Sequence, residues 1–138
     1  MKLKQVLSIE QIKHLQQLGL ETSDASIYWV RRSHGSRLDD KSKSDWFLSL
    51  QKEFMVCGFT SYEVIPTLTL QDILDKLPCF IGTHVLTLQK LANSGTCLYM
   101  EPYSRSILNL TESKELINSA YDMLCWCIEN GYVRKEGK

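Results

Sequence analysis

Glycine and proline are scarce in this sequence, and neither positive nor negative charge is in excess. Its 138 residues include seven glycines and three prolines, and sixteen Lys and Arg balance sixteen Asp and Glu. Every glycine is isolated, so no glycine-rich loop is available to cradle a phosphate. A dedicated duplex-DNA or RNA binder would be far more basic, because neutralising phosphates supplies most of its affinity. The composition therefore argues against enzymes that bind a nucleotide phosphate through a glycine-rich loop, and against dedicated nucleic-acid binders.

Long apolar runs are also missing. The longest extends only from Met123 to Ile128, whereas crossing a bilayer takes about 20 apolar residues. The first residues, 1–13, are interrupted by charged and polar side chains and do not form the apolar core of a signal peptide. The sequence has five cysteines, an odd number, and their spacings are not those of a disulfide framework. This predicts free thiols in a reducing compartment. We therefore expect a cytoplasmic chain with no membrane partner.

No spacing typical of a metal or cofactor site is present. There is no CxxC motif, and Cys125 and Cys127 lie about 200° apart if their segment is helical, so they cannot chelate one ion. The three histidines, His14, His34 and His84, are far apart in sequence. Cys57 and Cys79 are the thiols in non-helical context, and nothing marks either as an activated nucleophile. We expect no metal, no cofactor and no catalytic residue, and whether the chain is an enzyme stays open.

What is present predicts three helices. Ser8 with Gln11, and Thr69 with Asp72, have the spacing of capping boxes, so helices are expected over about 9–18 and 70–77. A third is expected over about 112–130, capped by Thr111 and closed by Gly131, because its apolar residues recur with a helical period.

Between the helices the hydrophobic period changes from 3.6 to 2, which predicts two β-hairpins. The first pairs 27–32 with 46–50 across a polar loop over Ser33–Asp45, and the second pairs 84–91 with 96–100. The segment Phe54–Phe59 could be a separate strand or a continuation of the preceding one. The expected fold is α+β, an antiparallel sheet of about four strands packed with three helices in a single domain over 1–138. Residues 33–45 are expected to form a mobile loop and 134–138 a frayed tail.

Trp126 is the residue closest to a functional signal. On a helical wheel it lies away from the apolar face, among Glu115, Ser119, Asp122 and Glu129. One interpretation is that Trp126 packs under the first helix or the Tyr132–Val133 segment. The other is an exposed anchor with an acidic rim, centred on Trp126 with Asp122 and Glu129, as in an interface hot spot.

A second candidate surface is basic. Arg31, Arg32 and Arg37 belong to a cluster that follows Tyr28 and Trp29, and basic side chains beside aromatics are typical of single-strand nucleic-acid binders. Neighbouring aspartates cancel about half of that charge, and strand alternation separates Arg31 from Arg32. A solvated hairpin tip is the alternative interpretation.

The order of several segments gives a resemblance. These segments are Leu7–Gln11, Leu18–Ser26, Thr69–Pro78 and Ala120–Tyr132. Together they resemble a group of small uncharacterised proteins encoded in prophages and other mobile elements of gut bacteria. The resemblance implies a mobile-element context and carries over no catalytic residue.

Two hypotheses from different classes follow. The first is a non-enzymatic accessory protein that binds a host or phage macromolecule, most simply a protein. The second is a small enzyme or nucleic-acid-associated accessory whose site is assembled from distant residues. Charge neutrality and the missing motifs favour the first.

Overall fold

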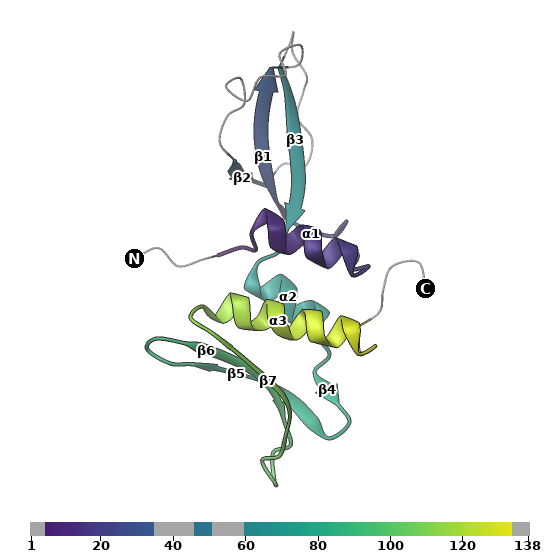
Figure 1. Ribbon diagram of the computed structural model, residues 1–138, viewed down its shortest axis with the longest axis vertical. Helices are drawn as coiled ribbons and strands as arrows, with labels where there is room; N and C mark the ends of the chain where they lie inside the picture. Colours follow the sequence, from purple (N-terminus) through teal and green to yellow (C-terminus); the bar gives the residue numbers. More distant parts are fainter. Residues whose placement is uncertain (1–4, 35–45, 51–59, 134–138) are drawn as a thin grey trace. The chain divides into compact units, whose positions relative to one another are not determined.

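The computed structural model describes residues 5–34, 46–50 and 60–133 of the chain. By its contacts the chain divides into a larger unit, Met1–Glu21 with Leu68–Lys138, and a smaller unit, Thr22–Thr67. Helices and antiparallel sheets make the fold α+β, as predicted (Figure 1). The single-domain organisation stays a prediction. In chain order the elements are α1 (Ile9–Gln17), β1 (Ile27–His34), β2 (Phe47–Ser49), β3 (Thr60–Thr67), α2 (Leu70–Lys76), β4 (Phe80–Ile81), β5 (His84–Lys90), β6 (Gly95–Met100), β7 (Ile107–Ser113) and α3 (Leu116–Glu129).

The first two helices begin where their caps predict. The Ser8 hydroxyl accepts from the Gln11 amide at 3.2 Å, and the Gln11 side chain accepts from the Ser8 amide at 2.9 Å. Thr69 and Asp72 make the same reciprocal pair at the start of α2. Each pair satisfies two amides that a helix start leaves without partners. Both capping boxes are therefore confirmed.

The third helix begins later than its periodicity predicts. α3 starts at Leu116, its N-cap is Glu115 without a side-chain hydrogen bond, and Thr111 lies within strand β7 instead. The prediction of a helix from about 112 with a Thr111 cap was wrong, because pairing with β6 outweighs local helix propensity there. Gly131 does adopt the left-handed conformation expected after a helix end, with φ +82°.

The larger unit contains a four-stranded antiparallel sheet in the order β4-β5-β6-β7. The predicted hairpin of β5 and β6 is confirmed, with Leu88 opposite Cys97. Strands β4 and β7 extend it on either side and were not predicted. Figure 1 shows α1, α2 and α3 on one side of this sheet, and α3 packs against β6 and β7.

The smaller unit contains a three-stranded sheet in the order β2-β1-β3. The predicted pairing of β1 with β2 is confirmed, for example Trp29 opposite Leu48. β3 was not predicted as a strand, although it pairs with β1 along its full length. β1 continues to His34, so the expected loop does not begin at Ser33. The rest of that loop, the segment Phe54–Phe59 and the tail 134–138 lie outside the described residues.

The core of the larger unit lies between its helices and the sheet. Fully buried side chains lie on all three helices and on the inner face of β6; they include Ile12, Leu15, Ile73, Met123, Leu124, Cys97 and Tyr99. None of the helices within the described residues is long and apolar enough to cross a membrane.

Candidate functional site

Asp122, Trp126 and Glu129 lie on one stripe of α3, because their spacings of four and three residues match the helical turn. Asp122 and Glu129 are exposed, and Trp126 is half-buried. The Trp126 ring lies against the Tyr132 ring, with 5.4 Å between centroids and an interplanar angle of 31°. Although Asp122 is exposed, desolvation of its carboxyl by the surrounding protein raises its pKa. Trp126 thus packs against the segment after the helix while keeping part of its surface open.

The other sides of α3 are covered. The Gln11 side chain of α1 donates to Asn118 at 3.0 Å, and His14 lies against Tyr121. On the sheet side, the Ser119 hydroxyl donates to the Gly95 carbonyl of β6 and Ser119 is fully buried. The prediction that Ser119 lies on the polar face of the helix with Asp122 and Glu129 was therefore wrong. A small hydroxyl can face the core when a backbone acceptor satisfies it, which a helical wheel does not show.

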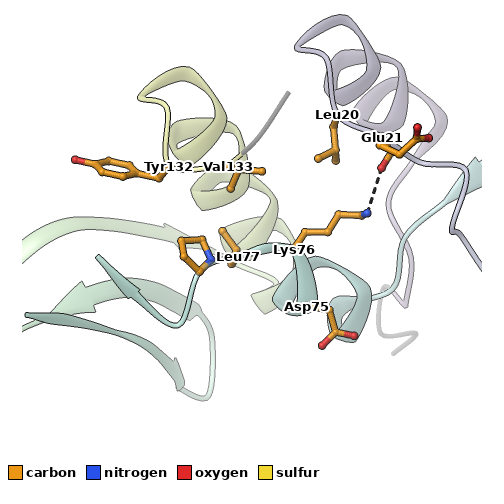
Figure 2. Close-up of a pocket in the computed structure, with 8 residues that line it drawn as sticks. Leu20, Glu21, Asp75, Lys76, Leu77, Tyr132 and Val133 are labelled. Carbon is orange, nitrogen blue, oxygen red and sulfur yellow. Dashed lines mark hydrogen bonds between the residues drawn. The ribbon is translucent and has the colours of Figure 1, made fainter. Parts of the chain in front are cut away.

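A cavity of about 390 Å³ adjoins the C-terminal end of α3. Its lining comes from the ends of all three helices, and Figure 2 shows the Tyr132 ring directed away from the other side chains drawn. The Lys76 ammonium donates to the Glu21 carbonyl at 3.1 Å, so it acts as a tie between α2 and the end of α1 (Figure 2). The remaining lining is mixed apolar and charged, with no converging set of polar groups that would define a ligand.

The predicted basic surface lies in the smaller unit. Arg31 makes a 2.8 Å ion pair with Glu63, and its guanidinium lies 4.5 Å from the Trp46 ring centroid. Both contacts occupy the groups that would otherwise meet a phosphate and a base. The backbone of Arg32 pairs with Tyr62, and Arg37 lies outside the described residues. The described part of this surface therefore gives little support for nucleic-acid binding.

The three cysteines of β6 and α3 are poor nucleophiles. Burial raises the pKa of Cys97 to about 12 and those of Cys125 and Cys127 to about 11. Cys79 is exposed, and Cys57 lies outside the described residues. In the described ranges, no three His, Cys, Asp or Glu side chains gather closely enough to hold a metal ion.

Sequence reasoning missed an apolar surface on the four-stranded sheet. The face turned away from α3, here called the outer face, can be identified because the Thr111 hydroxyl of β7 donates to the Ser119 carbonyl at 2.7 Å. Thr111 therefore points toward α3, and its neighbour Leu110 points to the outer face. The strand register aligns one apolar row across all four strands of that face: Phe80, Val85, Met100 and Ile107.

The two ends of this outer row are open to solvent. Phe80 is 64% exposed and Ile107 50%, and Leu110 in the next row is 46% exposed. Large apolar side chains gathered on one face are characteristic of interaction sites. The signal in the sequence is the alternation of apolar and polar residues in Leu108-Asn109-Leu110-Thr111, preceded by Ile107, which can be interpreted only once β7 is recognised as a strand.

The segments on which the expected prophage resemblance was based have structural roles in the described chain. Ser8 and Thr69 cap helices, and Ala120–Tyr132 supplies core residues of α3 and its C-terminal turn. None of them contributes to the outer row. Comparison of the chain with protein-family models, with curated proteins and with solved structures gives no match.

Proposed function

We propose that this chain is a non-enzymatic binding protein whose partner is another protein, contacted through the outer face of the four-stranded sheet. The observation that carries the proposal is the outer row, which ends in Phe80 at β4 and Ile107 at β7, both at least half exposed. Removing apolar surface of this kind from water favours association by about 25 cal/mol per Å².

The chemistry of the face favours a protein over a nucleic acid. The side chains of the row are all apolar, and the neighbouring outer residues are Thr87, Leu98 and Leu110. A nucleic-acid partner would require cations placed to neutralise phosphates. In the smaller unit, Arg31 is already engaged by Glu63 and Trp46.

The resemblance described above adds a biological setting to the proposal. An accessory protein of a prophage or mobile element, acting in the cytoplasm on a host or phage protein, agrees with a binding surface and with buried, protonated thiols. That setting is part of the proposal and rests on the resemblance alone.

The test is affinity capture from host cells followed by mass spectrometry, with wild type and variants compared side by side. Phe80→Asp places a charge at the open end of the row, and we expect it to abolish capture of a specific protein. The control is Leu91→Asp, at a residue 48% exposed beyond the end of β5 and outside the row. Urea unfolding should show that both variants keep wild-type stability within about 0.5 kcal/mol, as surface changes do. Equal capture by wild type and Phe80→Asp would contradict the proposal.

A further inference from the structure

Strand β7 forms one edge of the four-stranded sheet, and no other described strand pairs with its far side. An edge strand presents unpaired amide and carbonyl groups that can accept another strand. Natural proteins commonly protect such an edge with lysine, proline or a very short strand. β7 is seven residues long, contains neither lysine nor proline, and carries Glu112 as its sole charge. Its open edge therefore needs an explanation.

The side-chain pattern of β7 specifies what a pairing strand must carry. Asn109 and Thr111 point toward α3, where the Asn109 amide donates to the Met123 sulfur at 3.6 Å and Thr111 bonds to Ser119. Leu110 and Glu112 point to the outer face. A strand that continues the sheet must place short polar residues on the α3 side and apolar residues on the outer side. β7 itself has this pattern.

We propose that a second copy of this chain pairs with β7, antiparallel and edge to edge, about a two-fold axis at Leu110. The proposal rests on the proposed function in one respect, namely that this sheet is the interaction surface, and it names a second copy as one partner. When the two-fold axis passes through a residue, the two residues of each cross-strand pair are an even number of positions apart in the sequence. Their side chains therefore point to the same face of the combined sheet. An axis between two residues would set the outer face of one strand against the α3 face of the other.

Two features of β7 favour an axis at Leu110, namely the position of its charged residue Glu112 and the position of its β-bulge. The register with β6 shifts between Tyr99 and Met100, so Leu108 is the extra residue of a β-bulge. About Leu110, the residues Leu108–Glu112 pair symmetrically and the bulge lies at each end. Glu112 then lies opposite Leu108 of the partner, and the two Glu112 carboxylates stand about 13 Å apart along the strands. This exceeds the screening length of about 8 Å at physiological salt.

Registers with the axis nearer Glu112 bring the two Glu112 carboxylates closer together, and an axis at Asn109 would draw the bulge residue Leu108 into the centre of the pairing. An axis at Thr111 brings the two Glu112 residues to diagonal positions about 7–8 Å apart, and an axis at Glu112 sets them directly opposite one another. The Leu110 axis also places the half-exposed Leu110 against its own copy on the outer face. The outer faces of the two sheets then continue into one.

The register gives a specific crosslinking test on the full chain with Cys57 and Cys79 replaced by serine. Directly opposite residues in an antiparallel pair have Cα atoms about 4.5–5.5 Å apart, within the range a disulfide spans. Leu110→Cys should therefore give a covalent dimer on mild oxidation. The matched control is Leu108→Cys, whose two copies would be about 13 Å apart in this register and should stay monomeric. Equal crosslinking by both variants overturns the register.

The mass in solution tests the association itself. Pairing of five residues a side is smaller than the roughly 800 Å² per partner of a standard interface, so we expect a wild-type dimer that dissociates on dilution in sedimentation experiments. Leu110→Lys should be monomeric at every concentration because it sets two like charges at the axis, whereas Leu91→Lys should behave as wild type. A monomeric wild type without Leu110→Cys crosslinking, or a dimer unaffected by Leu110→Lys, overturns the proposal. Neither of these two outcomes would affect the capture experiment with Phe80→Asp, because β4 lies at the opposite edge of the sheet.

Discussion

The hydroxyl of Ser119 on α3 donates to the carbonyl of Gly95 at the start of β6, and both residues are buried. Gly95 makes this contact possible, because a Cβ added there would lie 2.6 Å from the Cα of Leu116 and 2.9 Å from its amide nitrogen. The first turn of α3 therefore rests directly on the backbone of the sheet. The side of the helix that carries Ser119 is fixed by this approach.

Gly95→Ala should consequently displace the start of α3. Overpacking against backbone costs about 1–3 kcal/mol, and we expect the free energy of unfolding in urea to fall by at least that amount. Gly82→Ala is the matched control, because nothing lies within 4 Å of a Cβ added at Gly82, although its φ of +63° carries a backbone penalty of about 1 kcal/mol. If both substitutions cost the same, Gly95 does not determine how closely the helix approaches.

Leu124 is fully buried on the apolar face of α3. Leu124→Ala should lower the free energy of unfolding by about 2–5 kcal/mol, since it removes buried methyl groups and leaves a cavity. That is a large share of the roughly 5–15 kcal/mol expected for a whole domain. Leu91→Ala, at an exposed residue, should change stability by less than about 0.5 kcal/mol. A urea midpoint unchanged in Leu124→Ala would contradict the burial of this face.

Much of the fold could be predicted because its signals are local. The capping boxes at Ser8 and Thr69 involve residues three apart, and the hairpin of β5 and β6 is closed by a short turn. β7 could not be assigned in the same way, because Thr111 is held by Cys97 and Ser119, which belong to other elements. Helical periodicity continues into 112–115, so tertiary pairing alone decides where α3 begins.

The candidate site was less predictable for the same reason. Trp126 stood out because an aromatic on a polar helical face is unusual. Phe80 and Ile107 did not, since an isolated apolar residue is ordinary in any sequence. Only the register that aligns Phe80, Val85, Met100 and Ile107 reveals a shared surface.

The buried thiols predict how stability changes at alkaline pH. The pKa of Cys97 is raised to about 12 and that of Cys127 to about 11, both by burial first, whereas an unfolded thiol has a pKa of about 8.5. Below about pH 8.5 both states are protonated and these thiols add no pH dependence. Above it the unfolded thiols ionise while the folded ones stay neutral, so stability falls as pH rises, by up to about 1.4 kcal/mol per pH unit for each thiol.

Urea unfolding from about pH 8 to about pH 10.5 measures this decline. The Cys97→Ala, Cys127→Ala double variant is less stable at every pH because of its cavities, but its stability should fall less steeply with pH. Equal slopes for wild type and the double variant would show that other groups cause the decline.

Trp126 and Tyr132 should be energetically coupled. Their ring centroids are 5.4 Å apart, and such aromatic pairs contribute about 0.5–1.5 kcal/mol beyond burial. A double-mutant cycle of Trp126→Ala and Tyr132→Ala should give a coupling energy in that range. Glu129→Ala, on the same stripe but exposed, should show no coupling to Tyr132.

Fluorescence separates the two interpretations of Trp126. With Trp29 and Trp46 replaced by phenylalanine, the remaining signal comes from Trp126 alone, and its half-buried ring should be quenched by acrylamide to an intermediate degree. Tyr132→Ala should increase that quenching, because Tyr132 covers one part of the ring. If Trp126→Ala lowers stability and leaves partner capture intact, the ring is a packing residue. If capture is lost in a variant of unchanged stability, the stripe with Asp122 and Glu129 is itself a binding surface, and the sheet would not be the main site of interaction.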